Sequence, residues 1–296
     1  MIRLMTWGAM MPTKRSIKHS ITGTDLKSSA ATAALMAREV NRMVAGMSRE
    51  IRAIIRDAYA VPDIEERQLI EVMDAKRDFN PVEIIAQKLG QMLDRWAAIF
   101  DEGAKVVAEK MINATIGRSN RELSKSLKDV SLDLTLKPTP AFTTYMDAAT
   151  QEAAALIKRV PGEFIPNVQQ DVMRSITQGR GLQDLIADLD KREVKVKNWS
   201  KNVARDQTRK AYATVNRVRL QEAGVRKFKW IHSGGSNEPR QHHLKRWPAG
   251  LNGGIFSFDD PPIIDPKTGE KGLPGQLPYC GCTFAPHIDL EEGDDE

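Results

Sequence analysis

The residues best suited to bind a metal ion lie in the last third of the chain. Two cysteines stand one residue apart, and four of the five histidines lie in the same region. These residues are Cys280, Cys282, His232, His242, His243 and His287. Two thiolates and two imidazoles form a good tetrahedral zinc set, and a loop-rich unit gains much stability from such a crosslink. The sequence therefore presents Cys280, Cys282 and His243 as candidate ligands of a structural zinc.

The spacing of the cysteines leaves a second interpretation open. A C-x-C pair is tighter than the two to four intervening residues that are usual in zinc knuckles, and the sequence has no second pair. In this interpretation, Cys280 and Cys282 lie on one face of an edge strand as small buried hydrophobic residues. His243 then forms a hydrogen bond with a nearby backbone group. The protein would in that case have no cofactor.

The same region contains residue types that a metal-dependent nuclease would use. They are His242, His243, Asn252, Asp259 and Asp260. The sequence has no P-loop, no G-x-S-x-G and no H-E-x-x-H motif, and Asp259 and Asp260 precede two prolines, which is typical of an exposed turn. We therefore predict that the protein is not an enzyme. A metal-dependent nuclease or toxin-like effector is the alternative.

Positive charge is concentrated in one segment of the chain. The formal net charge is +5 at pH 7, although residues 287–296 form an acidic tail with six carboxylates. Residues 191–229 contain thirteen Lys and Arg against three acids. Such a localised charge attracts polyanions, whereas a bare run of charge can also be a solvated helix face. Both interpretations apply to this segment.

The basic segment includes a long helix, predicted at about residues 198–223. Lys201, Arg205 and Arg209 are spaced by four, so their charges align along one edge of that helix. Lys210 and Arg217 add to the same helix. We predict that these five residues contact nucleic-acid phosphates.

The hydrophobic pattern predicts a mostly helical chain that ends in short strands. Apolar residues recur at three- and four-residue steps in each predicted helix. Helices are predicted at 29–58, 80–112, 119–130, 141–159, 166–178, 181–190 and 198–223, and strands at 227–232, 254–258 and 282–288. The first two helices are expected to pair antiparallel. The 119–130 helix is predicted from a capping box at Ser119 and Glu122.

These elements indicate an α+β fold, with predominantly helical N-terminal and central regions and a small antiparallel β-containing C-terminal unit. Residues 1–28 are predicted to be a flexible basic arm, and 29–135 an N-terminal helical domain. A boundary falls in the proline-containing stretch 131–140. Residues 136–286 then form a second domain, with helices over 141–223 and a small sheet over 226–286. No stretch of 18 uncharged apolar residues is present to span a bilayer.

Four aromatic residues are assigned to the core of the C-terminal unit. So small a unit needs large aromatic side chains to fill its core, and these are Trp230, Trp247, Phe256 and Phe258. Arg240 precedes His243 by three residues. It is expected to clamp a carboxylate or phosphate, or to pair with Asp259 or Asp260.

The order of features from about Ile165 to Pro286 resembles the phage Mu F-like family of minor head, or head morphogenesis, proteins. The matching segments are the helix Ala204–Val225, the strand KFKWIHSG, the R-x-x-H step, GGIFSFDDPP and PGQLPYCGC. Their motif positions are Trp230, Arg240, His243, Phe256, Asp259, Asp260, Cys280 and Cys282. The sequence departs from the family where Gly281 replaces a frequent Arg between the cysteines, and where the 244–252 loop is longer.

The resemblance implies a minor protein of a tailed double-stranded DNA phage, with a role in head assembly or genome delivery. Its expected partners are the portal protein and packaged double-stranded DNA, with scaffold or major capsid protein as further candidates, and no membrane. Its expected location is inside the capsid near the portal, and the host cytoplasm during assembly. Docking of the N-terminal helices on a partner is a hypothesis drawn from their amphipathic pattern.

Overall fold

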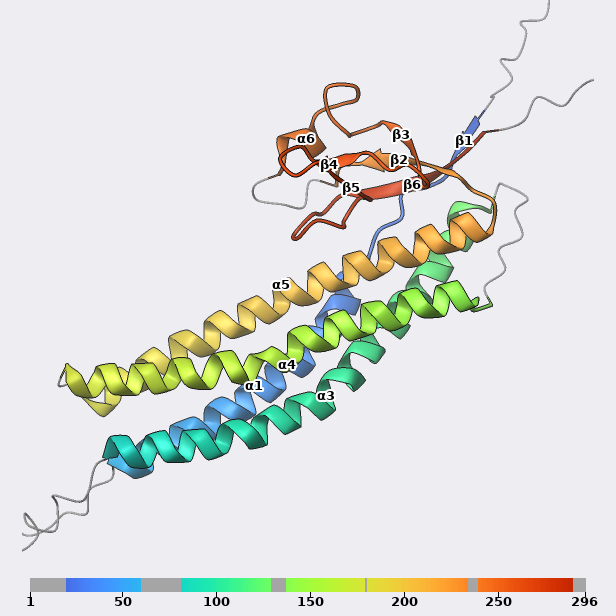
Figure 1. Cartoon of the computed structure of the whole chain (residues 1–296). Helices are drawn as coiled ribbons and strands as arrows, with labels where there is room; N and C mark the ends of the chain where they lie inside the picture. The colour runs from blue at the N-terminus through green and yellow to red at the C-terminus, as the bar shows by residue number, and fades with distance from the viewer. Residues whose placement is uncertain (1–19, 60–80, 129–136, 179, 234–238, 290–296) are drawn as a thin grey trace, which may run out of the picture.

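Four long helices form an antiparallel bundle (Figure 1). The computed structural model describes residues 20–59, 81–128, 137–178, 180–233 and 239–289. The helices are α1 (Ala30–Tyr59), α3 (Pro81–Ser126), α4 (Pro140–Thr177) and α5 (Leu182–Glu222). Successive helices run in opposite directions along the length of the bundle (Figure 1). The expected antiparallel pairing of the first two helices is confirmed.

The bundle has one hydrophobic core to which all four helices contribute. On α1, Val44, Met47, Ile51 and Ile55 are completely buried. Their spacing of three and four residues places one stripe of the helix against its neighbours. The same core includes residues of α3, α4 and α5. The predicted boundary at 131–140 therefore does not separate two helical cores, although residues 131–136 lie outside the described part of the chain.

Three predicted interruptions of the helices are wrong. Helix α3 continues through the predicted capping box, because Ser119 is buried and donates a hydrogen bond to Asn216 Oδ1 at 2.7 Å. Helix α4 continues through Pro161 and Pro166. Helix α5 joins the helices predicted at 181–190 and 198–223. In each case the buried stripe extends across the predicted break.

An ion-paired carboxylate lies within the joined region of α5. Glu193 Oε2 accepts a hydrogen bond from Arg52 Nη2 of α1 at 2.6 Å, and Glu193 also pairs with Lys197. Burial raises the pKa of Glu193, but the hydrogen bonds from Lys197 and Arg52 outweigh it and hold the pKa below its ordinary value. The contact therefore binds α5 to α1 where sequence reasoning expected a gap.

A small antiparallel sheet follows the bundle, as predicted. Its strands are β1 (Ser20–Thr22), β2 (Lys227–Ile231), β3 (Ile255–Ser257) and β6 (Thr283–Asp289), in the order β1-β6-β2-β3. Strands β4 (Ile263–Asp265) and β5 (Glu270–Lys271) form a second, two-stranded sheet, and α6 (Gln241–Leu244) is a single turn.

The sheet packs on α5 through a second hydrophobic core. Phe228, Trp230 and Phe284 lie on one face of the sheet and are almost completely buried. They share their core with Tyr212 and Leu220 of α5. The expected packing of the sheet on the preceding basic helix is therefore confirmed.

The expectation of a flexible arm over residues 1–28 is wrong for residues 20–28. Strand β1 pairs with β6, and Leu26 is buried against the sheet with its N–H donating to the Phe284 carbonyl at 2.9 Å. The sequence signal was weak because β1 has only three residues. Residues 1–19 lie outside the described part of the chain, as do residues 290–296 of the acidic tail. Among the described helices, none combines the length and hydropathy that crossing a bilayer needs.

Candidate metal centre and cationic groove

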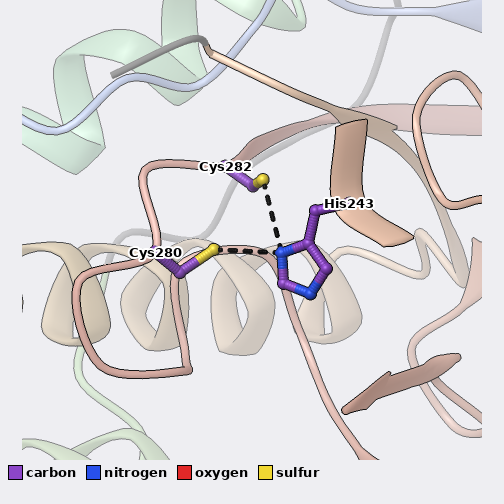
Figure 2. Close-up of side chains that lie close together, drawn as sticks. All are labelled: His243, Cys280 and Cys282. Carbon is purple, nitrogen blue, oxygen red and sulfur yellow. Dashed lines mark hydrogen bonds between the residues drawn. The ribbon is translucent and has the colours of Figure 1, made fainter. Parts of the chain in front are cut away.

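Two cysteines and one histidine converge beside the sheet (Figure 2). Cys280 and Cys282 lie in the loop that leads into β6, and His243 lies on α6. The loop turns tightly, with positive φ angles at Gly275 and Tyr279. The cysteines are therefore in a loop, and they do not lie on an edge strand as one interpretation expected.

The three side chains face one another in a buried cluster. Nδ1 of His243 is 3.5 Å from Cys280 Sγ and 3.7 Å from Cys282 Sγ. All three donor atoms lie within 4.8 Å of one another, and each residue is at most 6% exposed. Among the residues that the structure describes, no other group of three His, Cys, Asp or Glu is arranged in this way.

A hydrogen bond at the second ring nitrogen of His243 fixes the tautomer of the imidazole. Nε2 lies 2.8 Å from the carbonyl oxygen of Ile264 in β4. A carbonyl can only accept, so Nε2 carries the proton and the lone pair of Nδ1 is directed at the two sulfur atoms. The expected hydrogen bond between His243 and the backbone is confirmed, and it leaves Nδ1 available as a ligand.

The two thiols differ in their electrostatic environment. A hydrogen bond from Cys282 is the main reason why the pKa of Cys280 falls to about 4. The hydrogen bond of Cys282 to Cys280 and its burial raise the pKa of Cys282. Burial alone lowers the pKa of His243, but its hydrogen bond with Cys280 outweighs this and the pKa is raised. The lowered pKa of Cys280 favours its thiolate, which is the form of cysteine that binds soft metal ions.

Several other predicted motif residues surround this cluster. Trp230 packs edge-on to the His243 ring, with the ring centroids 5.2 Å apart. Arg240 Nη2 donates to the carbonyl oxygen of Pro278 at 3.2 Å, which ties it to the cysteine loop. No contact of Arg240 with Asp259 or Asp260 is present among the described residues. Arg240 therefore supports the loop.

Three of the four aromatic core assignments agree with the structure. Trp230 and Phe258 are buried, and Phe256 packs partly buried against the same core. Trp247 was expected in the core, but it is 56% exposed. Its ring contacts Phe256 edge-on at the surface of the sheet, because the long 244–252 loop carries it outward.

The residues that could have formed a nuclease site are separated. Asp259 pairs with Arg226 and Asp260 with Lys271, both at the surface. His242 Nε2 lies 2.9 Å from the Ile263 carbonyl, and Asn252 Oδ1 accepts the backbone N–H of His232. His243 faces the cysteines, so these side chains do not converge on one position.

The predicted cationic edge of α5 divides into two groups. Arg209 Nη1 contacts the Cys280 carbonyl at 3.5 Å, and Lys210 pairs with Asp206 and Glu152. Arg217 lies over the ring of Tyr145, 5.0 Å from its centroid. These three side chains are partly buried and engaged within the protein.

Lys201 and Arg205 are exposed and line a groove between α5 and α1. The groove has a volume of about 230 Å³ and a floor of alanines. Arg38 of α1 forms its opposite wall, and no carboxylate is among the residues that line it. Sequence reasoning missed Arg38, because only the packing of α1 on α5 brings it beside the other two. We call Arg38, Lys201 and Arg205 the cationic groove.

Comparison with known proteins covers the region that contains the cluster of Cys280, Cys282 and His243. One curated protein of Haemophilus influenzae, described as an uncharacterized protein, is 27% identical over 224 residues. The match covers 74% of this chain and 47% of that protein, so the chain spans about half the length of this relative. No solved structure matches the chain significantly. The family model for phage Mu protein F like proteins matches residues 166–285, so this part of the chain is similar to that family, in agreement with the resemblance seen in the sequence.

Proposed function

We propose that the protein is a minor head protein of a tailed double-stranded DNA phage and acts in head morphogenesis. The observation that carries this proposal is the family match over residues 166–285. The matched residues include the last third of α4, all of α5 and most of the C-terminal sheet. The matched region therefore corresponds to a continuous part of the fold, and a phage head protein is the function class that it supports.

Within the head, we place the protein at the portal vertex in contact with packaged DNA, with a role in assembly or genome delivery. The cationic groove supports the contact with DNA, because three cations in a groove that no carboxylate lines suit a phosphate backbone. The portal protein is the proposed main partner. Scaffold or major capsid protein is the further candidate for the helical bundle.

The proposed role is one of binding and assembly, without turnover. The separation of His242, Asn252, Asp259 and Asp260 supports it, since metal-dependent hydrolysis needs such groups to converge. The buried position of His243 and the two cysteines supports it further, because a substrate would need access to the cluster.

The test is the composition of purified phage heads. Mature and immature heads would be purified from the phage that encodes the protein and analysed by quantitative mass spectrometry. We expect the chain in mature heads at far fewer copies than the major capsid protein. Heads from a phage that lacks the gene serve as the control for background peptides.

Absence of the chain from both kinds of head would contradict the proposal. Presence in immature heads alone would contradict the mature-head location and assign the protein to transient scaffolds. Metal-dependent cleavage of DNA by the purified chain, lost in His243→Ala, would support the nuclease alternative.

A further inference from the structure

We propose that Cys280, Cys282, His243 and His232 bind one structural Zn²⁺ ion. The notable addition is His232, which sequence reasoning did not single out from the other histidines. The site would join the end of β2, the turn α6 and the loop before β6. This inference goes beyond a role in the phage head and does not depend on it.

The distances in the cluster fit a tetrahedral zinc site. With Zn–S bonds of about 2.3 Å and Zn–N bonds of about 2.0 to 2.1 Å, neighbouring sulfur and nitrogen ligands are about 3.6 Å apart. The two sulfur atoms lie 3.5 Å and 3.7 Å from Nδ1 of His243. Both sulfur–nitrogen distances thus match the separation that one zinc ion requires, and all three donor atoms lie within 4.8 Å of one another.

The fourth ligand is supplied by the pairing of β2 with β6. Ile231 lies opposite Thr283 in the antiparallel register, so the next pair along the chain is His232 and Cys282. Nδ1 of His232 is 3.5 Å from Cys282 Sγ, the separation of two ligands of one zinc. His232 is not among the three residues whose donor atoms all lie within 4.8 Å of one another, so its ring would have to move closer to the other two ligands on binding. The His232 backbone N–H is held by Asn252 Oδ1 at 3.0 Å, which fixes the position of this residue.

The surroundings of the cluster favour a structural ion. The Ile264 carbonyl accepts the Nε2 proton of His243 and orients the ring, as backbone groups do for many metal-bound histidines. Thiolate and imidazole ligands select zinc over magnesium or calcium. With His232 as the fourth protein ligand beside the three buried ones, no position remains open for a substrate.

Such an ion would stabilise a part of the fold that has little regular structure. Between β2 and β6 the residues that the structure describes form only α6 and strands of two or three residues. Elements this short are marginal without a crosslink or a large core. A zinc ion bound by residues before, within and after this segment supplies that crosslink.

Metal content and unfolding of the full-length protein test the proposal. The protein would be purified under reducing conditions, so that no disulfide replaces the metal, and its metal content measured by plasma mass spectrometry. We expect about one zinc per chain. Removal of zinc with a chelator should lower the unfolding temperature, and cobalt should give the visible absorption of a tetrahedral ion with thiolate ligands.

Variants test which of the four residues are zinc ligands. Cys282→Ser should lose zinc, and His232→Ala should bind it about tenfold more weakly or worse. His242→Ala is the matched control, because His242 is adjacent to a ligand but its Nε2 contacts the Ile263 carbonyl, and the variant should bind zinc like the parent. Cobalt spectra of the parent protein remain informative if a ligand variant fails to fold.

Two results would overturn the proposal. If the reduced parent protein binds neither zinc nor cobalt, the cysteines are small buried hydrophobic residues. If His232→Ala binds zinc as tightly as His242→Ala does, the four-ligand assignment is wrong and His232 is not a ligand.

Discussion

At the scale of single residues, the same type of side chain has different roles along α5. Arg209 and Lys210 contact groups of the protein itself, whereas Lys201 and Arg205 face a groove that also contains Arg38. Exposed cations that do not already pair with a carboxylate are free to neutralise phosphate. The proposed contact with DNA is therefore expected at the cationic groove and not along the whole edge of α5.

We expect duplex DNA to bind the protein without sequence preference, and the triple variant Arg38→Ala, Lys201→Ala, Arg205→Ala to bind more weakly. Loss of three phosphate contacts should reduce the slope of log affinity against log salt concentration by about 3. Fluorescence anisotropy over a salt series measures both quantities.

The matched control removes three exposed cations of α3, in the variant Lys88→Ala, Lys105→Ala, Lys110→Ala. It changes the net charge equally and should leave the salt slope closer to that of the parent. If both triple variants bind alike, the groove is an ordinary solvated surface.

The spacing of Lys201 and Arg205 could be predicted from the sequence, because residues four apart share a helix face. Arg38 could not be predicted, since it belongs to a distant helix and only tertiary packing brings it to the groove. The same distinction applies to the candidate metal ligands. Residue types indicated Cys280, Cys282 and His243, but His232 became a candidate only through the register of β2 with β6.

At the scale of elements, the sequence indicated which segments are helical but not where the helices end. Two local signals favour a break in a helix, namely Pro161 and the capping box at Ser119. Each disfavours a continuous helix by about a few kcal/mol of free energy. The buried stripes of α3 and α4 extend across them and outweigh these signals. Local chemistry predicts a helix boundary only where the apolar stripe ends as well.

The crossing of α1 and α3 depends on a glycine, which gives a prediction for Gly46. A Cβ atom at Gly46 would lie 2.9 Å from Cη2 of Trp96, whose Nε1 donates to Glu50. We expect Gly46→Leu to displace Trp96 and to lower the free energy of unfolding by about 1 to 3 kcal/mol. Thermal and urea unfolding measure the change.

Gly90 of α3 provides the contrasting control. No atom lies within 4 Å of a Cβ built there, so Gly90→Ala should stabilise the helix by about 0.5 to 1 kcal/mol. A neutral or stabilising effect of Gly46→Leu would show that the two helices are not packed as closely as the structure has them.

At the scale of the whole molecule, the two halves of the chain build both cores together. Helices α1 and α3 complete the bundle core with α4 and α5. Leu26, Leu123 and Leu127 belong to the core of the C-terminal sheet, and β1 pairs with β6. The family-matched region 166–285 therefore lacks packing partners for both of its hydrophobic surfaces when it is taken alone.

This arrangement predicts that a chain cut between residues 128 and 137 folds only when both pieces are present. Fragments 20–128 and 137–289 should each be poorly folded alone, because each exposes half of both cores. When they are co-expressed, the fragments should copurify and give the helical circular dichroism and cooperative melting of the intact chain.

A pair of variants tests the shared core. Leu26→Asp places a charge in the shared core and should weaken the association of the fragments. Leu35→Asp, at a position on α1 that is 39% exposed, should not weaken it. Cooperative folding of fragment 137–289 alone would contradict the shared cores and show that this part of the chain is an independent domain.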